Sequence, residues 1–208
     1  MELGSQIEKA AVDLSPAEFG EKLRGTKGLK ILDIGSGGRL SISLKKGDLY
    51  VMVDPVIDPN GSIISGLNRR DVGSQVISFS GSVEDVPVFA PDLTLIVAPN
   101  PVDIIDGDLL NSARPFLRQS KNVLVVLDTR TIEATINPVT FRADNSGLNE
   151  AKGKVSLFLT RLGFDVQRKR GMNDSIASVL RDMGIDRQGM LNSGDLGAEK
   201  VLILGVRN

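Results

Sequence analysis

Residues 29–38 form an apolar run that ends abruptly in an acidic residue and a cluster of glycines, reading Leu29-Lys30-Ile31-Leu32-Asp33-Ile34-Gly35-Ser36-Gly37-Gly38. A short apolar run bounded by glycines is typical of a buried strand that ends in a tight turn. Glycine reaches positive φ and places no Cβ between the main chain and a ligand. A helix that begins after such a turn presents free N–H groups. The pattern predicts a strand–loop–helix unit against which a small ligand can lie.

The glycine pattern departs from two familiar phosphate-binding loops. Leu40 stands where Gly-x-Gly-x-x-Gly would have its third glycine, and no Gly-Lys-Ser/Thr follows, which excludes a P-loop. The distinctive residue is Asp33, two positions before the first glycine. The alternative to a ligand loop is a bare structural turn, with Asp33 as a cap.

Composition limits the available chemistry. The 208 residues are enough for one domain with a sizeable core, and no apolar run approaches the roughly 20 residues of a membrane-spanning helix. The chain has no cysteine and no histidine, which excludes disulfides, thiol nucleophiles, imidazole bases and imidazole metal ligands. Any acid–base work falls to Asp, Glu, Lys or the single Tyr50. A net charge of −1 gives no global nucleic-acid signature, and the lack of cysteine fits the cytoplasm.

Apolar periodicity predicts seven strands separated by helices. We expect strands over residues 29–34, 49–53, 75–79, 92–97, 122–127, 164–167 and 200–206. We expect helices over 6–25 with a restart near Ser15, over 106–118 and over 147–162, and a short helix or turn over 40–44. Buried strands alternating with helices predict a mostly parallel sheet covered on both faces. Its ligand site would lie beyond the carboxyl ends of the strands, where Asp33, Asp54, Gly81–Asp85 and Pro99–Pro101 fall.

The segment Leu-Asp-Ile-Gly-Ser-Gly-Gly closely resembles motif I of the class I S-adenosylmethionine-dependent methyltransferases. The resemblance continues through Tyr-Val-Met-Val-Asp-Pro at 50–55, Ser-Gly-Ser-Val-Glu-Asp-Val-Pro at 80–87 and later segments, covering about residues 29–206. It implies one α/β domain over 1–208, Rossmann-like and doubly wound, with a mostly parallel seven-stranded sheet and an antiparallel last strand. Residues 1–28 would form an N-terminal helical segment, and 171–198 an insertion on the substrate side.

The same resemblance implies a site for S-adenosylmethionine (SAM). Asp33, Gly35, Ser36 and Gly37 would face the methionine end of the cofactor, while Asp54, followed by Pro55, would bind the ribose hydroxyls. Ser82 and the Val83 backbone would lie along the adenine, and Pro99 would complete the pocket; Ser82 departs from the aspartate usual in the family. For Asp54 a simple turn before proline is the alternative. No metal is implied.

Catalysis would consist mainly of alignment, because the sulfonium methyl group is already activated. Asn100, held between two prolines, is the residue expected to touch the acceptor, and Asp103 or Asp106 is a candidate base. The predicted function is SAM-dependent methyl transfer to a small molecule or peptide, with no membrane partner. The alternatives are an inactive cofactor-binding partner subunit, an RNA methyltransferase that uses the basic cluster at 161–170, and an aminopropyltransferase-like or other nucleotide-binding protein. The oligomeric state is left open.

Overall fold

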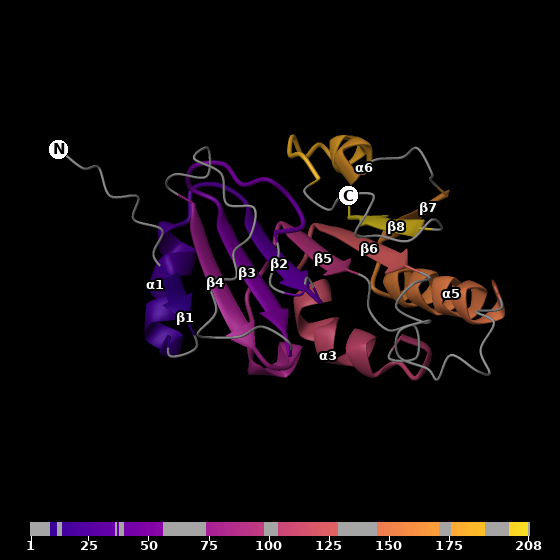
Figure 1. The fold of residues 1–208 in the computed structure, drawn as a ribbon, viewed down its shortest axis with the longest axis horizontal. Coiled ribbons are helices and arrows are strands. Elements are labelled where there is room, and N and C mark those ends of the chain that lie inside the picture. The colour runs from indigo at the N-terminus through magenta and orange to yellow at the C-terminus, as the bar shows by residue number, and fades with distance from the viewer. Residues whose placement is uncertain are drawn as a thin grey trace.

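A computed structural model describes residues 9–11, 14–35, 37, 40–55, 74–97, 104–128, 145–170, 176–189 and 200–207. Within these ranges, eight strands form one sheet in the order β1-β4-β3-β2-β5-β6-β8-β7 (Figure 1). The strands are β1 (Lys9–Ala11), β2 (Lys30–Ile34), β3 (Leu49–Asp54), β4 (Gln75–Ser80), β5 (Leu93–Val97), β6 (Asn122–Asp128), β7 (Asp165–Arg170) and β8 (Lys200–Val206).

The strand pairing confirms the predicted fold class. Strands β1 to β6 run parallel to one another, whereas β8 lies antiparallel between β6 and β7. The predicted strands agree closely with β2 to β8 because their apolar runs fill a sheet buried on both faces. Since β8 is antiparallel to both neighbours, β7 runs in the same direction as β2 to β6. The carboxyl ends of these six strands therefore lie at one edge of the sheet.

Helices cover the sheet on both faces. They are α1 (Pro16–Gly25), α3 (Asp108–Leu117), α5 (Asn145–Arg161) and α6 (Ile176–Asp182), with the 3-10 helix η2 at Val83–Asp85. In Figure 1, α3 and α5 lie on one side of the sheet and α6 lies on the opposite side. Among the described helices, none has both the length and the apolar content needed to span a membrane.

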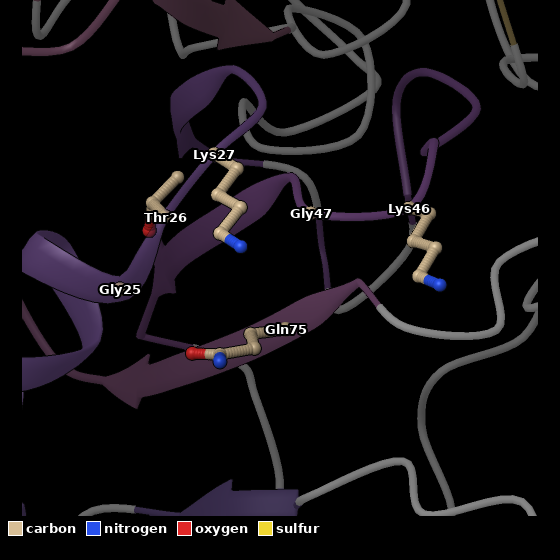
Figure 2. Close-up of a pocket in the computed structure, with 6 residues that line it drawn as sticks. All are labelled: Gly25, Thr26, Lys27, Lys46, Gly47 and Gln75. Carbon is tan, nitrogen blue, oxygen red and sulfur yellow. The ribbon is translucent and has the colours of Figure 1, made fainter.

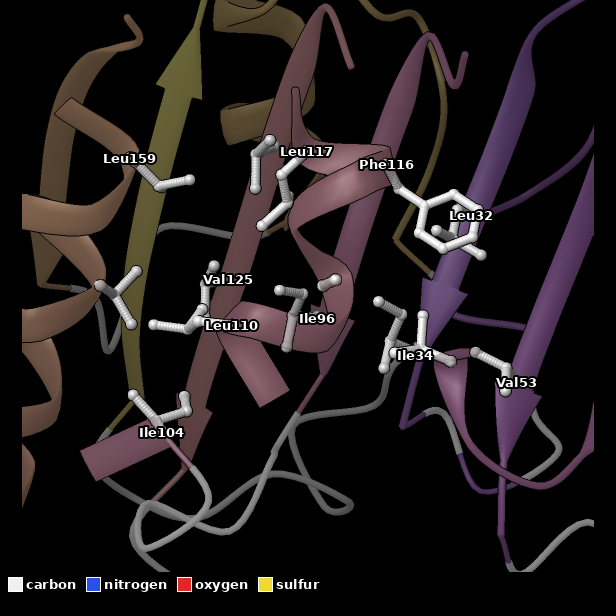
Figure 3. Close-up of a cluster of buried hydrophobic side chains, with 14 of the residues drawn as sticks. Leu32, Ile34, Val53, Ile96, Ile104, Leu110, Phe116, Leu117, Val125 and Leu159 are labelled. Carbon is white, nitrogen blue, oxygen red and sulfur yellow. The ribbon is translucent and has the colours of Figure 1, made fainter. Parts of the chain in front are cut away.

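Strand alternation divides the core into two layers. On β2, Leu32 and Ile34 contact the cluster beneath α1, α3 and α5, which includes Phe116 and Leu159 (Figure 3). Ile31 belongs to the other cluster, beneath segment 40–44 and α6. Because successive side chains on a strand point to opposite faces, Asp33 lies on the Ile31 face. An acidic residue thus sits in the apolar layer between the sheet and α6.

The N-terminal segment differs from the single helix expected over 6–25. Residues Lys9–Ala11 pair with β4 as an added parallel edge strand, while a helix begins at Pro16 after the predicted restart at Ser15. The Ser15 and Glu18 side chains form a capping box there. Residues Lys9–Ala11 form backbone hydrogen bonds with the otherwise free edge of β4. These bonds outweigh the helix propensity of Ala10 and Ala11.

Segment 40–44, expected as a short helix or turn, contains no helix. Ile42 instead forms an antiparallel bridge with Gly189, and Ser43 N donates to Gln188 O at 2.8 Å. Leu40, Ile42 and Leu44 are all buried. Their strict alternation with serine has the period of a strand, so an extended segment buries all three leucine and isoleucine side chains on one face. The expected helix after the glycine loop was therefore wrong.

A buried ion pair fastens the chain after α6 to the start of β3. The Arg187 guanidinium donates from Nη2 to both Asp48 carboxylate oxygens at 2.9 Å, and from Nε to Oδ2 at 3.1 Å. The Asp48 side chain is 0% exposed. Its two oxygens also accept hydrogen bonds from the backbone N–H groups of Leu29 and Lys45. This bond set joins three segments at the amino-terminal edge of the sheet.

Candidate cofactor site at the carboxyl edge of the sheet

The glycine loop begins directly at the end of β2 and bends toward the ends of its two neighbours. Gly35 N donates to Val53 O of β3 at 3.0 Å. Gly35 has φ +84°, and a Cβ there would approach Val97 O of β5 to 2.8 Å. Both the backbone angle and the close contact require glycine at this position. The loop thus leaves the sheet between β3 and β5.

Asp54 ends β3 beside this loop. Its Oδ2 accepts a hydrogen bond from Gly37 N at 2.8 Å, and the residue is 6% exposed. Gly37 has φ +63° and is exposed. The structure thus brings together Gly35, Gly37 and Asp54, which are separated in sequence by as many as 19 positions, at one edge of the sheet. Their meeting follows from the parallel pairing of β2 with β3.

The loop after β4 is the third element at this edge. Gly81 N lies 3.4 Å from Asp54 O, so this loop adjoins the end of β3. Asp85 Oδ2 accepts from Ser82 N at 2.8 Å, which closes the turn into η2. The Val83 side chain is buried in the core, and its carbonyl oxygen accepts from Val86 N at 3.3 Å. Ser82 is exposed beside it.

The remaining acidic side chain of that loop has a structural partner. The Ser112 hydroxyl of α3 donates to Glu84 Oε1, and this hydrogen bond is the main cause that holds the pKa of Glu84 below its usual value. Glu84 therefore fastens η2 to α3, while Asp85 closes the turn of its own loop.

Asp33 is the most unusual group near the site. It is 0% exposed, and its Oδ2 accepts from the Ser41 hydroxyl at 2.5 Å and from the Tyr50 hydroxyl. Oδ1 has no hydrogen-bond partner among the described residues. Burial raises the pKa of Asp33 to about 7, against the opposing effect of the two hydroxyl donors. This carboxyl group changes its charge near neutral pH.

Tyr50 and Ser41 complete the buried network around Asp33. Tyr50 Oη accepts from Ser41 N at 2.9 Å while donating to Asp33. Burial, followed by the nearby Asp33 carboxylate, raises the pKa of Tyr50, so its hydroxyl keeps its proton. The sequence marked Tyr50 as the chain's single tyrosine and as one of the side chains available for acid–base work. Its place on the same face as Asp33 could be found only from the strand register, in which Tyr50 pairs with Ile31.

The other predicted site residues divide into two groups. Pro55 follows Asp54 and is exposed at the same edge. Ser36, Pro99, Asn100 and Asp103 lie outside the described residues, so their predicted roles stay predictions. Asp106 is described and exposed just before α3.

A pocket of about 330 Å³ lies at the opposite edge of the sheet. Figure 2 shows its lining by residues that precede or begin β2, β3 and β4, namely Gly25, Thr26, Lys27, Lys46, Gly47 and Gln75. It is separated from Asp54 by the length of β3. This pocket is therefore distinct from the candidate cofactor site.

Comparison with known proteins places this arrangement in a known fold. No protein-family profile and no curated sequence matches the chain. A mutant of the 16S rRNA (adenine(1408)-N(1))-methyltransferase from Catenulisporales acidiphilia is similar in structure, with a TM-score of 0.56 and 16% identity over 97% of both chains. Another mutant of that enzyme, with its cosubstrate SAM, gives 0.55 and 17% over 97% of this chain and 95% of the other.

The antibiotic-resistance methyltransferase Kmr is a further structural neighbour. Its TM-score is 0.51 at 13% identity, over 97% of this chain and 98% of Kmr. The neighbours' fold agrees with the sheet described above, in which β2 to β8 form the seven-stranded core and β1 is an additional edge strand. The chain has the class I methyltransferase fold.

Proposed function

We propose that this protein binds SAM at the carboxyl edge of its sheet and transfers the methyl group to an acceptor. The observation that carries the proposal is the buried Asp54 carboxylate beside the glycine loop, with Oδ2 2.8 Å from Gly37 N. A carboxylate at this place can accept hydrogen bonds from both ribose hydroxyls. The glycine loop lets the methionine end approach the main chain. One of the structural neighbours is described with SAM as its cosubstrate.

In this proposal the described residues hold the cofactor, and the acceptor is oriented by residues after β5. Asp54 and Pro55 would face the ribose, Ser82 and the Val83 backbone the adenine, and Asp33 the ammonium group of the methionine end. Ser36 and Pro99 would add to this pocket. The protein's main contribution to rate would be alignment of the acceptor with the methyl group and exclusion of water.

Asn100 and Asp103 are proposed for the acceptor side, as an orienting amide and a base. Asn100→Ala should lower turnover at saturating cofactor at least tenfold while changing SAM affinity little, because a residue acting on the acceptor contributes only after the cofactor is bound. Steady-state kinetics with a direct titration of SAM separates the two effects. A collapse of SAM affinity with normal turnover would place Asn100 in the cofactor pocket instead.

RNA is a second candidate acceptor, beside the small molecule or peptide that the neutral charge favours. It is supported by the structural neighbours, whose description is 16S rRNA (adenine(1408)-N(1))-methyltransferase. It is also supported by the position of β7, which carries the run Arg168-Lys169-Arg170 to the carboxyl edge of the sheet. Arg and Lys are the residue types that neutralise backbone phosphates.

Methyl transfer from isotope-labelled SAM tests the proposal and separates the acceptors. Purified small ribosomal subunits, total RNA and a metabolite extract would be offered in parallel, and the label followed in each product. Label in RNA supports the second candidate, and label in a small product supports the first. Binding of SAM without transfer to any of these acceptors would favour the inactive partner-subunit alternative. A protein that binds another nucleotide but not SAM would contradict the proposal.

A further inference from the structure

Residues 40–48, which the structure describes after the glycine loop, contain no helix. The loop's first half is anchored to β3 through Val53 O and Asp54 Oδ2. Its far end is fastened at Ser41, whose N–H donates to Tyr50 Oη and whose hydroxyl donates to Asp33 Oδ2. β3 therefore supplies anchors at both ends of the loop, and the Asp33–Ser41–Tyr50 network holds its far end.

This network also restrains the Asp33 carboxylate. Two hydroxyls converge on Oδ2, which leaves Oδ1 buried and without a hydrogen-bond partner among the described residues. A buried, unpaired carboxylate oxygen is costly unless a donor reaches it. The ammonium group of an amino-acid ligand is such a donor, and it would also compensate the negative charge.

We propose that Tyr50, with Ser41, is a positioning residue of the cofactor site: the two hydroxyls hold Asp33 Oδ2 so that Oδ1 accepts from the ammonium group of the bound cofactor. The inference rests on the proposed function. It assigns to Tyr50 no contact with the cofactor itself. Its effect passes through the orientation and the charge of Asp33.

The titration of Asp33 provides the readout. Among the described residues, the titratable groups that act on Asp33 are Tyr50 and Asp54, both on β3; Ser41 comes from segment 40–44, and the β5 partner Leu95 is uncharged. The ionised carboxylate is the form that attracts an ammonium ion, so binding strengthens as pH rises through the pKa of about 7. A one-proton titration with that midpoint predicts about tenfold tighter binding at pH 8 than at pH 6.

Removing the Tyr50 hydroxyl should shift the pH dependence of cofactor affinity to higher pH. The hydroxyl donates to Asp33 and so lowers its pKa; in Tyr50→Phe the pKa rises by about one to two units, since a hydrogen bond to a charged group is lost. Affinity at pH 7 should then fall about tenfold and recover as pH increases. Ser41→Ala should shift the profile in the same direction.

The experiment is calorimetric titration of wild type, Tyr50→Phe and Ser41→Ala with S-adenosylhomocysteine from pH 6 to 8.5. Thr94→Val is the matched control, because it removes another buried hydroxyl, hydrogen-bonded to Ser120 at 2.6 Å, without touching Asp33. Its profile should match that of wild type. 5′-Methylthioadenosine, which has no amino-acid end, should bind all four proteins with little pH dependence.

The outcomes distinguish failure of the positioning role from failure of the proposed cofactor binding. If the affinity of the wild type for S-adenosylhomocysteine does not change with pH, the positioning role is overturned while cofactor binding stands. The same holds if both Tyr50→Phe and Ser41→Ala have the pH dependence of the wild type. An equal pH dependence for 5′-methylthioadenosine shows that Asp33 does not act on the ammonium group, and also overturns it. Absence of S-adenosylhomocysteine binding at every pH overturns the proposed function and this inference together. Urea unfolding at pH 8 verifies that each variant is folded.

Discussion

Asp54→Ala is expected to weaken SAM and S-adenosylhomocysteine binding by about 2–4 kcal/mol, or roughly thirtyfold to a thousandfold, through the loss of charge-assisted hydrogen bonds. The Asp54 carboxylate also accepts from Gly37 N, so its removal loosens the glycine loop as well as the ribose contact. The fold should persist, because Asp54 lies at a strand end and the apolar layers remain intact. Isothermal titration of folded variant and wild type measures the difference.

Two further variants sharpen the Asp54 test. Asp54→Asn keeps one acceptor oxygen for Gly37 N but loses the charge, and it should show an intermediate loss of affinity. Asp92→Ala removes a carboxylate at the opposite edge, where Asp92 accepts from Lys30 N and pairs with Lys121, and it should leave affinity unchanged. Equal affinities in wild type and Asp54→Ala would make Asp54 a loop anchor only.

Arg187→Ala is expected to lower the free energy of unfolding by about 3 kcal/mol, because it leaves the buried Asp48 charge without its cationic partner. The backbone N–H groups of Leu29 and Lys45 still donate to Asp48. The expected loss in free energy of unfolding is therefore at the lower end of the range for a broken buried ion pair. Since Asp48 lies at the amino-terminal edge of the sheet, SAM affinity of the folded variant should not change. Urea denaturation with a matching SAM titration measures both quantities.

The neighbouring residue provides the control for Arg187. Asp186 pairs with Lys45 at 2.6 Å, but its side chain is 91% exposed and that of Lys45 is 53% exposed. Solvent screens such a pair, so Asp186→Ala should leave the free energy of unfolding essentially unchanged. A loss for Arg187→Ala that is as small as the loss for Asp186→Ala would contradict the assigned role of the buried pair.

The sheet was predictable from the sequence because its strands are buried on both faces. Runs such as Leu93–Val97 and Asn122–Asp128 have few polar positions, and the first of them lies between Pro91 and Pro99 in the sequence. The meeting of Gly35, Gly37 and Asp54 was also predictable, since parallel strands bring their carboxyl ends to one edge. The roles given to these residues, in contrast, come from the resemblance and await the titrations.

The parts that were missed depend on contacts between distant segments. The strand pairing of Lys9–Ala11 is decided by the free edge of β4, and the extended form of segment 40–44 by its bridge to Gly189. The alternation of Leu40, Ile42 and Leu44 with serine could have indicated the extended conformation of segment 40–44. No local pattern indicated that Tyr50 or Arg187 would bond to buried carboxylates, because those partners lie 17 and 139 positions away.

Direct calorimetric titration of the full chain with S-adenosylhomocysteine tests the assignment of the edge formed by the glycine loop and Asp54 as a SAM site. This assignment predicts saturable one-to-one binding at pH 8, reduced at least thirtyfold in Asp54→Ala and unchanged in Asp92→Ala. Folded wild-type protein that shows no binding of either S-adenosylhomocysteine or SAM at that pH would contradict it.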